Sequence, residues 1–490
     1  MTRSIPQILV LSALLSAALA GCGSGNAEPA PGTAARDASP MHDGIGATDA
    51  APAPVAPADA APVPVAPADA APAPVAVADA GSSTSIGTAM SSIQRIANPQ
   101  VPVSDTTTLA ADNAAFAFAA YNLLTTTNTN LVFSPASISI ALAMTYAGAA
   151  GTTATEMAGA LHFTLPPAQL HPAFNVLDQA LASRGQGKLG ADGGPMRMNI
   201  VNALWAEQTY TFKSDFLDTL AANYGAGVNL LDFLHSPDPS RLAINAWVAA
   251  QTADKIQDLL PQGSVSSSTA LVLTNAVYFN AAWKTPFDAN KTHDGSFTLL
   301  DGSTVTVKFM DGDGSYLPAM QGTNFVATSI PYADNNLSLV VVLPDAGQLS
   351  QVESSLDATA LATLVTGLTA QRVGLFLPRF KLQTGLSLAG TLKNLGMTSA
   401  FERGTADFSG MDGTHDLCIG DVIHKAFIDV AEKGTEAAAA TGVVMVSASI
   451  PTPPPPELLI VANRPFLYFL RDQPTGAILF MGRVLDPSQN

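Results

Sequence analysis

Residues 432–446 read Glu-Lys-Gly-Thr-Glu-Ala-Ala-Ala-Ala-Thr-Gly-Val-Val-Met-Val, and the structure of this stretch decides how the whole chain is interpreted. Gly434 has no side chain, so the backbone can reverse its direction there. The run that follows changes from very small side chains to β-branched and apolar ones, which suit a strand. In a strand, alternate residues share one face, which here carries Thr435, Ala437, Ala439, Thr441, Val443 and Met445.

None of these six side chains is charged, and the one charge in the run, Glu436, falls on the opposite face. A segment with this pattern can lie exposed as a loop and can also insert between two strands without placing a charge in the core. The alternative structure is an alanine-rich helix, because alanine is the best helix former. The stretch alone leaves both structures open, and the rest of the chain decides between them.

The chain has 490 residues and a net charge of −17, and its sequence contains nothing that resembles a basic patch. This charge argues against nucleic acid as a partner. The sequence also lacks a glycine-rich phosphate loop, a His-Glu-x-x-His metal motif and a nucleophile elbow. Because its seven histidines are scattered, we expect neither a metal site nor a cofactor.

The amino terminus has the layout of an export signal. Arg3 precedes an apolar run at residues 8–20, and no acidic residue occurs before Glu28. The run is too short to span a bilayer as a mature helix. It ends in Leu19-Ala20-Gly21-Cys22, which resembles the bacterial lipobox, whose cysteine is acylated and becomes the first residue of the mature protein.

We therefore predict that residues 1–21 are a lipoprotein signal peptide and that the lipidated Cys22 attaches the protein to a membrane. The alternative is an ordinary secretory peptide with an incidental cysteine. Gly23 differs from the aspartate that is associated with retention in the inner membrane, which favours the outer membrane. We expect a lipid-anchored protein of the bacterial cell envelope, either periplasmic or exposed at the surface.

Residues 22–105 are rich in proline and alanine and poor in large apolar side chains. Three successive decapeptides, Ala51–Ala60, Ala61–Ala70 and Ala71–Ala80, each lie close to A-P-x-P-V-A-P-A-D-A. Frequent proline favours extended polyproline II, so this segment is predicted to be a disordered, semi-stiff tether. At about 3.1 Å per residue, the tether could hold a domain up to roughly 250 Å from a membrane.

Residues 106–490 have the composition of a globular domain. Ser134-Pro135 marks a helix start, and residues 244–260 have the apolar spacing of another helix. Helical patterns dominate the first half of the domain and strand patterns the second, which predicts an α+β fold with large sheets. The apolar runs typical of buried strands are residues 270–279, 337–343, 373–377, 423–430 and 477–484.

Five short motifs, in this order along the chain, resemble those of the serpin family. They are Asn130–Ile138 (NLVFSPASI), Thr274–Trp283 (TNAVYFNAAW), Leu377–Phe380 (LPRF), His424–Phe427 (HKAF) and Asn463–Leu467 (NRPFL). One such motif is a weak signal, whereas five in order are specific, and the resemblance covers about residues 107–488. It implies the serpin fold, in which helices pack on large mixed and antiparallel β-sheets and a reactive-centre loop is exposed.

In serpins, a target protease cleaves the exposed loop and is caught as an acyl-enzyme, after which the loop inserts into the central sheet as a new strand. Insertion competes with deacylation, so small inward-facing residues favour trapping. The resemblance implies a monomeric serine-type endopeptidase inhibitor rather than an enzyme, with a target serine protease as its covalent partner. By the same resemblance the hinge consists of Glu432, Gly434, Thr435, Ala437, Ala439 and Thr441.

The alternative is a non-inhibitory serpin-fold binding protein or a surface scaffold. The small side chains of the hinge argue against it, because many non-inhibitory serpins depart from this composition. The resemblance therefore favours the inhibitor.

The reactive bond follows from counting, because in serpins it lies after the fourteenth residue that follows the hinge glycine. Here that residue is Ala448, followed by Ser449, and a slip of register would leave Ser447 or Met445 as candidates. A small residue before the bond suits an elastase-like or subtilisin-like protease and disfavours trypsin-like enzymes. Pro451–Pro456 lengthens the downstream side, as a spacer or by setting another register.

Four polar residues match serpin positions that form a hydrogen-bonded cluster where the strands part for the loop: Ser134, Ser137, Asn275 and His424. Serine and histidine together also suggest a hydrolase, but no acid or oxyanion motif accompanies them. Trp283 matches the position where the hinge enters the sheet, and its alternative role is ordinary core packing. The physiological protease and the membrane face stay open at this point.

Overall fold

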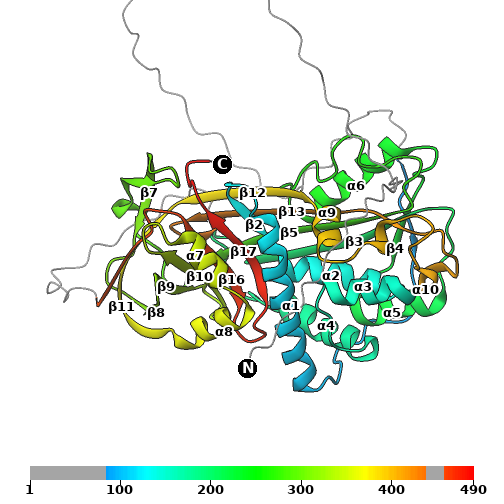
Figure 1. Cartoon of the computed structure of the whole chain (residues 1–490), viewed down its shortest axis with the longest axis horizontal. Coiled ribbons are helices and arrows are strands. Elements are labelled where there is room, and N and C mark those ends of the chain that lie inside the picture. Colours follow the sequence, from blue (N-terminus) through cyan, green and yellow to red (C-terminus); the bar gives the residue numbers. More distant parts are fainter. Residues whose placement is uncertain (1–83, 437–456, 490) are drawn as a thin grey trace, which may run out of the picture. The chain divides into compact units, whose positions relative to one another are not determined.

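The computed structural model describes residues 84–436 and 457–489, all of which belong to one compact unit. Within these residues the chain forms two large β-sheets and a set of helices (Figure 1), so the predicted α+β class is confirmed. Several sequence-predicted features lie outside the described residues. They are the signal peptide, Cys22, most of the tether, Ala437, Ala439, Thr441, Ala448, Ser449 and Pro451–Pro456.

The first sheet has seven strands and contains the hinge. Its central strand, β5, is buried at every position except the last, which explains the continuous apolar run in the sequence. In spatial order the strands are β1 (Gly87–Ala89), β4 (Val228–Leu231), β3 (Arg197–Glu207), β5 (Leu271–Ala282), β14 (Gly434–Thr435), β13 (Ile419–Ala431) and β12 (Phe380–Ser387).

The second sheet has ten strands and is largely antiparallel. The strand β15 (Leu458–Val461), which follows the residues that the structure does not describe, pairs in parallel with β11. The other strands follow the order β2 (Leu131–Phe133), β17 (Ile478–Val484), β16 (Phe466–Asp472), β10 (Leu337–Pro344), β9 (Phe325–Pro331), β8 (Ser315–Gln321), β11 (Thr369–Pro378), β7 (Thr304–Asp311) and β6 (His293–Thr298).

The helices cover both faces of the first sheet, with α2 on one side and α6 on the other (Figure 1). Successive side chains of β5 point to opposite faces of the sheet. Leu273 therefore packs in the larger core, which includes α2, and Val272 packs in the smaller core under α6. The α-helices are α1 (Val103–Leu124), α2 (Pro135–Tyr146), α3 (Gly151–Ala160), α4 (Pro167–Ala182), α5 (Ser214–Tyr224), α6 (Pro237–Gln251), α7 (Leu349–Ser355), α8 (Ala358–Gly367), α9 (Ala389–Asn394) and α10 (Ser409–Asp412).

Helix α2 begins at Pro135 directly after Ser134, as the Ser-Pro signal predicts. The helix predicted at residues 244–260 is correct only in part, because α6 starts at Pro237 and ends at Gln251. The apolar residues that follow α6 do not continue the helix. Instead Ile256, Leu259 and Leu260 are buried in the same core as α6, so tertiary packing accounts for their apolar character.

The folded part starts before the predicted boundary at residue 106. Strand β1 pairs with β4, and Arg95 forms an ion pair of 2.6 Å with Asp178 of α4. Helix α1 itself begins at Val103. The residues just after the proline-rich repeats therefore belong to the domain, although they contain few large apolar side chains.

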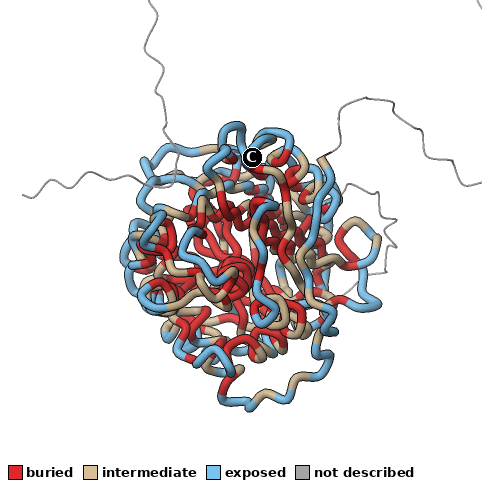
Figure 2. The backbone as a smooth tube through the Cα atoms, turned by 90° about the vertical axis from the view of Figure 1, so that its right-hand side faces the viewer, coloured by how far each residue is buried: buried red, intermediate tan, exposed pale blue. Residues whose placement is uncertain are grey.

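Buried residues are concentrated inside the unit, and exposed residues lie mainly at its periphery (Figure 2). They include the apolar runs that the sequence assigned to strands, such as those of β5, β10, β13 and β17. Within the described ranges, no helix combines the length and the apolar character that crossing a membrane requires.

Candidate functional site

The seam between β5 and β13 is the site towards which the sequence motifs converge. Along most of its length the two strands are parallel neighbours, with seven paired positions that run from Leu271 and Ile419 to Val277 and Ala426. Beyond Val277 they separate, and β14 lies between them, antiparallel to both. The sheet is therefore open at one end, and the first hinge residues already occupy the opening.

Gly434 is the residue at which the hinge enters the sheet. It pairs with Ala282 on β5 and with Ala431 on β13. A Cβ atom at this position would overlap the carbonyl oxygen of Ala281, and it would also meet Ala282 and Ala191. Only glycine fits here, because the hinge backbone approaches β5 too closely for any side chain.

Thr435 is fully buried and points into the core beneath the sheet. Its hydroxyl lies 2.5 Å from the hydroxyl of Tyr332, so its polar group is satisfied within the core. Tyr332 in turn stacks on Trp283, with ring centroids 4.4 Å apart. The site therefore accepts a small side chain with one hydroxyl.

Trp283 holds the chain just before the hinge strand. Its indole N–H donates to the carbonyl of Ala431 at 2.8 Å, and its backbone N–H donates to the carbonyl of Lys433 at 2.9 Å. The first acceptor is the last residue of β13, and the second lies in the turn that connects β13 to β14. The structure thus places Trp283 at the hinge entrance, where its indole also packs against the core.

Glu432 is buried in this turn and is held by hydrogen bonds from three residues. Its carboxylate accepts from the Arg379 side chain at 2.6–2.7 Å and from the Thr292 hydroxyl at 2.5 Å. Its carbonyl accepts the backbone N–H of Phe287 at 2.9 Å. Burial by itself would raise the pKa of Glu432, but the hydrogen bonds from Thr292 and Arg379 outweigh it and lower the pKa.

Glu436 directly follows β14 and is buried, although its expected position on the outward face did not indicate burial. Its carboxylate forms an ion pair with Lys255, in the segment that follows α6, and its second oxygen has no partner among the described residues. Burial and a hydrogen bond to Glu436 raise the pKa of the Tyr278 hydroxyl to about 12. The φ of Glu436 is +58°, a left-handed conformation in which a strand cannot continue.

A second group of polar residues lies under the seam, where β5 and β13 are still paired. His424 of β13 and Asn275 of β5 are directly opposite each other in the parallel register. Ser134 precedes α2 and Ser137 lies in its first turn, and α2 packs beneath the sheet. The structure therefore brings together all four residues that the sequence assigned to this cluster.

The hydrogen bonds of the cluster form one directed network. The backbone N–H of Ser134 donates to His424 Nε2 at 3.1 Å, which leaves the proton on Nδ1, and Nδ1 donates to Asn275 Oδ1. The Asn275 amide donates to Ser137 Oγ and to Asn202 Oδ1. Ser137 Oγ also donates to Asn202 Oδ1 at 3.2 Å, so the network joins α2, β3, β5 and β13.

His424 is neutral in this network. Complete burial lowers its pKa from 6.5 to about 3. Protonation would place a second N–H opposite the backbone N–H of Ser134 and would remove the acceptor that this group needs. The network thus depends on a neutral imidazole.

The cluster does not have the geometry of a hydrolase. Ser134 bonds to His424 through its backbone, and its buried hydroxyl has no partner among the described residues. Ser137 bonds to amides rather than to the imidazole. The arrangement therefore offers no serine activated by a histidine.

Sequence reasoning missed several members of the site. Asn202 was recognisable as a polar residue between apolar neighbours in β3, because even a partly buried amide needs hydrogen-bond partners. Arg379 was recognised only as part of the Leu377–Phe380 motif, and no local sequence pattern indicates its hydrogen bond to Glu432. Tyr332 and Lys255 contact the hinge from segments that share no spacing pattern with it.

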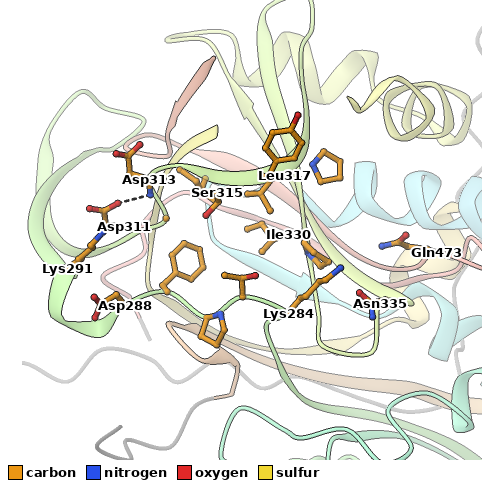
Figure 3. Close-up of a pocket in the computed structure, with 18 residues that line it drawn as sticks. Lys284, Asp288, Lys291, Asp311, Asp313, Ser315, Leu317, Ile330, Asn335 and Gln473 are labelled. Carbon is orange, nitrogen blue, oxygen red and sulfur yellow. Dashed lines mark hydrogen bonds between the residues drawn. The ribbon is translucent and has the colours of Figure 1, made fainter. Parts of the chain in front are cut away.

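A cavity of about 510 Å³ lies next to the Glu432 turn (Figure 3). The two are adjacent because Phe287, which donates to the Glu432 carbonyl, also lines the cavity. Lys284 extends into it from the segment after β5, and Asp311 and Asp313 lie on the opposite side, where Asp311 accepts the N–H of Asp313 at 2.8 Å.

Across the described part of the chain, no cluster of three or more His, Cys, Asp or Glu residues could hold a metal ion.

The geometry consists of a central sheet whose strands β5 and β13 separate at one end, with Gly434 and Thr435 paired in the opening. The family model described as "Serpin (serine protease inhibitor)" matches residues 111–487. The leukocyte elastase inhibitor of Bos taurus is 38% identical over 389 residues, which cover 77% of this chain and 99% of that protein. The chain therefore belongs to the serpin family, which is described as a family of serine protease inhibitors.

Solved structures agree with this assignment. The thermophilic serpin tengpin in its native state is 27% identical, with a TM-score of 0.71, and the match covers 82% of this chain and 99% of tengpin. Human thyroxine-binding globulin, in complex with thyroxine, is 30% identical with a TM-score of 0.69 over 78% of this chain and 99% of that protein. The serpin fold predicted from the sequence is confirmed.

Proposed function

We propose that this protein is an inhibitory serpin that acts as a monomeric suicide substrate of serine proteases. The observation that carries the proposal is the hinge itself, with Gly434 and Thr435 paired between β5 and β13. A chain that has already started to insert can continue once the loop is cleaved and the seam ahead of it opens. Each strand residue that follows gains roughly 1 kcal/mol net per backbone hydrogen bond, in addition to apolar burial.

The sequence beyond Thr435 supports continued insertion. The next inward-facing residues are Ala437, Ala439 and Thr441, which are small and uncharged. The obstacle in the starting structure is the seam, where seven paired positions and the His424–Asn275 bond must separate. Cleavage frees the amino-terminal part of the loop from its attachment to β15. Completion of the sheet then compensates for the strand pairs that are lost at the seam.

We propose Ala448–Ser449 as the reactive bond and an elastase-like or subtilisin-like enzyme as the target. The count from Gly434 and the small side chain of Ala448 support this choice. The names of the relatives agree with it, because the matched Bos taurus protein is a leukocyte elastase inhibitor. Trypsin-like enzymes are disfavoured, because they require Arg or Lys before the bond.

The test is to incubate the protein with an elastase and, in parallel, with trypsin. We expect a detergent-resistant adduct with elastase and none with trypsin. The carboxyl-terminal peptide released by the elastase should begin at Ser449 in mass spectrometry. Complete cleavage by elastase without an adduct would rule out trapping, and a peptide that starts more than two residues away would reject the proposed bond.

The second candidate is a non-inhibitory serpin-fold binding protein or a surface scaffold. Its support is the similarity to thyroxine-binding globulin, whose structure holds a small ligand. The hinge favours the inhibitor, because binding alone does not require a run of small inward-facing residues. The elastase experiment separates the two candidates.

We further propose that Cys22 is lipidated and anchors the protein to the bacterial cell envelope, with the outer membrane favoured. The support is the sequence Leu19–Cys22 at the end of the apolar run. The wild-type protein should partition with membranes, and Cys22→Ala should release or stall it. Wild-type protein found unacylated in the soluble fraction, with another first residue, would contradict the anchor.

A further inference from the structure

A cavity of about 220 Å³ lies between α1, α4 and the turn that joins β16 to β17. Helices α1 and α4 run side by side in this region (Figure 1). Apolar side chains such as Leu109, Ala173 and Leu177 form most of the wall, and none of the lining side chains is charged. At the surface Val103, which is 80% exposed, also lines it. The cavity thus has an apolar interior that opens to solvent.

Asn113 of α1 lines this cavity and is only 4% exposed. Neither its amide nitrogen nor its amide oxygen has a hydrogen-bond partner among the described residues. Buried polar side chains are rarely left in this state, because the lost bonds to water are not replaced. One unpaired donor and one unpaired acceptor therefore lie together at the wall of an apolar space, where a ligand can pair with both.

We propose that this cavity binds a small neutral molecule, with an apolar body in the cavity and a carboxamide group bonded to Asn113. A carboxamide offers a C=O to the Asn113 N–H and an N–H to the Asn113 oxygen, which satisfies both atoms at once. An apolar cavity of roughly 150 Å³ accommodates benzene, so this one suits a molecule of about ten non-hydrogen atoms.

The surroundings select against a charged ligand. The nearby ionisable groups on α1, Asp105 and Asp112, are both acidic and buried, and the whole chain carries a charge of −17. A carboxylate would lack the donor that the Asn113 oxygen requires, and no charged side chain lines the cavity to neutralise it. The proposal is independent of protease inhibition, because the cavity shares no residue with the hinge or the seam.

The test is calorimetric titration of the full-length protein with 3-phenylpropanamide. The comparison probes are 3-phenylpropanoate, which is charged, and butylbenzene, which has no polar group. We expect saturable binding of the amide, and binding of the other two probes at least about tenfold weaker, since each lacks one or both hydrogen bonds to Asn113. An absence of saturable amide binding would mean that only ordered water fills the cavity and would overturn the proposal.

Two variants locate the binding. Asn113→Leu removes the amide, and Ala110→Phe obstructs the cavity from a partly exposed position that also lines it. Both should abolish binding of 3-phenylpropanamide while the elastase adduct still forms, which shows that they fold. Asn223→Leu is the matched control, because Asn223 is a buried asparagine of α5 outside the cavity. Binding that survives both cavity variants would refute the site.

Discussion

At Thr435 the structure already buries the first side chain that loop insertion has to bury. The hydroxyl pairs with Tyr332 at 2.5 Å, and the residue has no exposed surface. A charged side chain in this position would lack any partner, and an unpaired buried charge costs several kcal/mol. In the proposed mechanism, the chemistry of this one position should therefore decide whether insertion is faster than deacylation.

We predict that Thr435→Arg converts the inhibitor into a substrate. The loop should still be cut by elastase, but insertion should be slow enough for deacylation to win, so protease activity survives. Thr435→Ser is the control, because it keeps the small size and the hydroxyl, and it should inhibit like wild type. The measurement is residual elastase activity together with the yield of adduct. Equal inhibition by Thr435→Arg and wild type would contradict loop insertion.

Glu436 leads to a second prediction at the same scale. Its buried carboxylate depends on Lys255 and has one oxygen without a partner. Lys255→Met should lower the stability of the intact protein by about 1–2 kcal/mol, a value reduced from that of a fully buried pair because Lys255 is half-exposed. Glu436→Gln needs no counter-ion, so the double variant should lose less than the sum of the two single variants. Strictly additive losses in urea unfolding would argue against the pair.

Some of these residue-scale features could be predicted from sequence and others could not. The serpin resemblance assigned Gly434 and Thr435 to the hinge, and the structure places them between β5 and β13. The left-handed backbone of Glu436 could not be predicted, because it depends on Lys255 and Tyr278, which approach from distant segments. Tyr332 was not recognisable for the same reason.

At the scale of the elements, the network of His424, Asn275, Ser137 and Asn202 connects β13, β5, α2 and β3 beneath the seam. Insertion of a strand has to break the bond between His424 and Asn275, since the two residues face each other across the line that opens. The network therefore keeps the uncleaved sheet closed below the hinge. Its strength depends on the neutral form of the imidazole.

The pKa of His424 predicts how acid affects the fold. It falls from 6.5 to about 3 in the native protein, so between these pH values the unfolded chain binds a proton that the folded chain does not. Stability should therefore decrease as the pH falls through this window, by up to about 1.4 kcal/mol per pH unit for this group. His424→Gln keeps a donor and an acceptor without titrating, so its stability should depend less on pH. Identical pH slopes in urea unfolding of the two proteins would contradict this role.

Element boundaries were predicted less well than the motifs. The buried strands β5, β10, β13 and β17 followed from apolar runs, because strands covered on both faces contain few polar residues. Helix α6 was misplaced, since the apolar residues after Gln251 are buried by tertiary packing and not by helical periodicity. Strand β1 gave no signal, because three small residues that pair at a sheet edge have no distinctive pattern.

At the scale of the whole molecule, the first sheet has an unfinished centre between two cores. The larger core lies beneath it with α2, and the smaller one lies under α6. A strand that entered the seam would place its inward residues against the larger core, next to the position that Thr435 already occupies. The uncleaved fold is therefore expected to be less stable than the cleaved one, in which the sheet is complete.

The heat stability of the loop-cleaved protein tests this central claim most directly. The loop is cut with thermolysin, a zinc protease that uses activated water and forms no acyl-enzyme, so cleavage proceeds without trapping. Thermal unfolding of intact and cleaved wild type should then differ, with the cleaved form more stable by at least about 10 °C. Cleaved Thr435→Arg should gain less. A cleaved wild type that unfolds at the same temperature as the intact protein would contradict strand insertion.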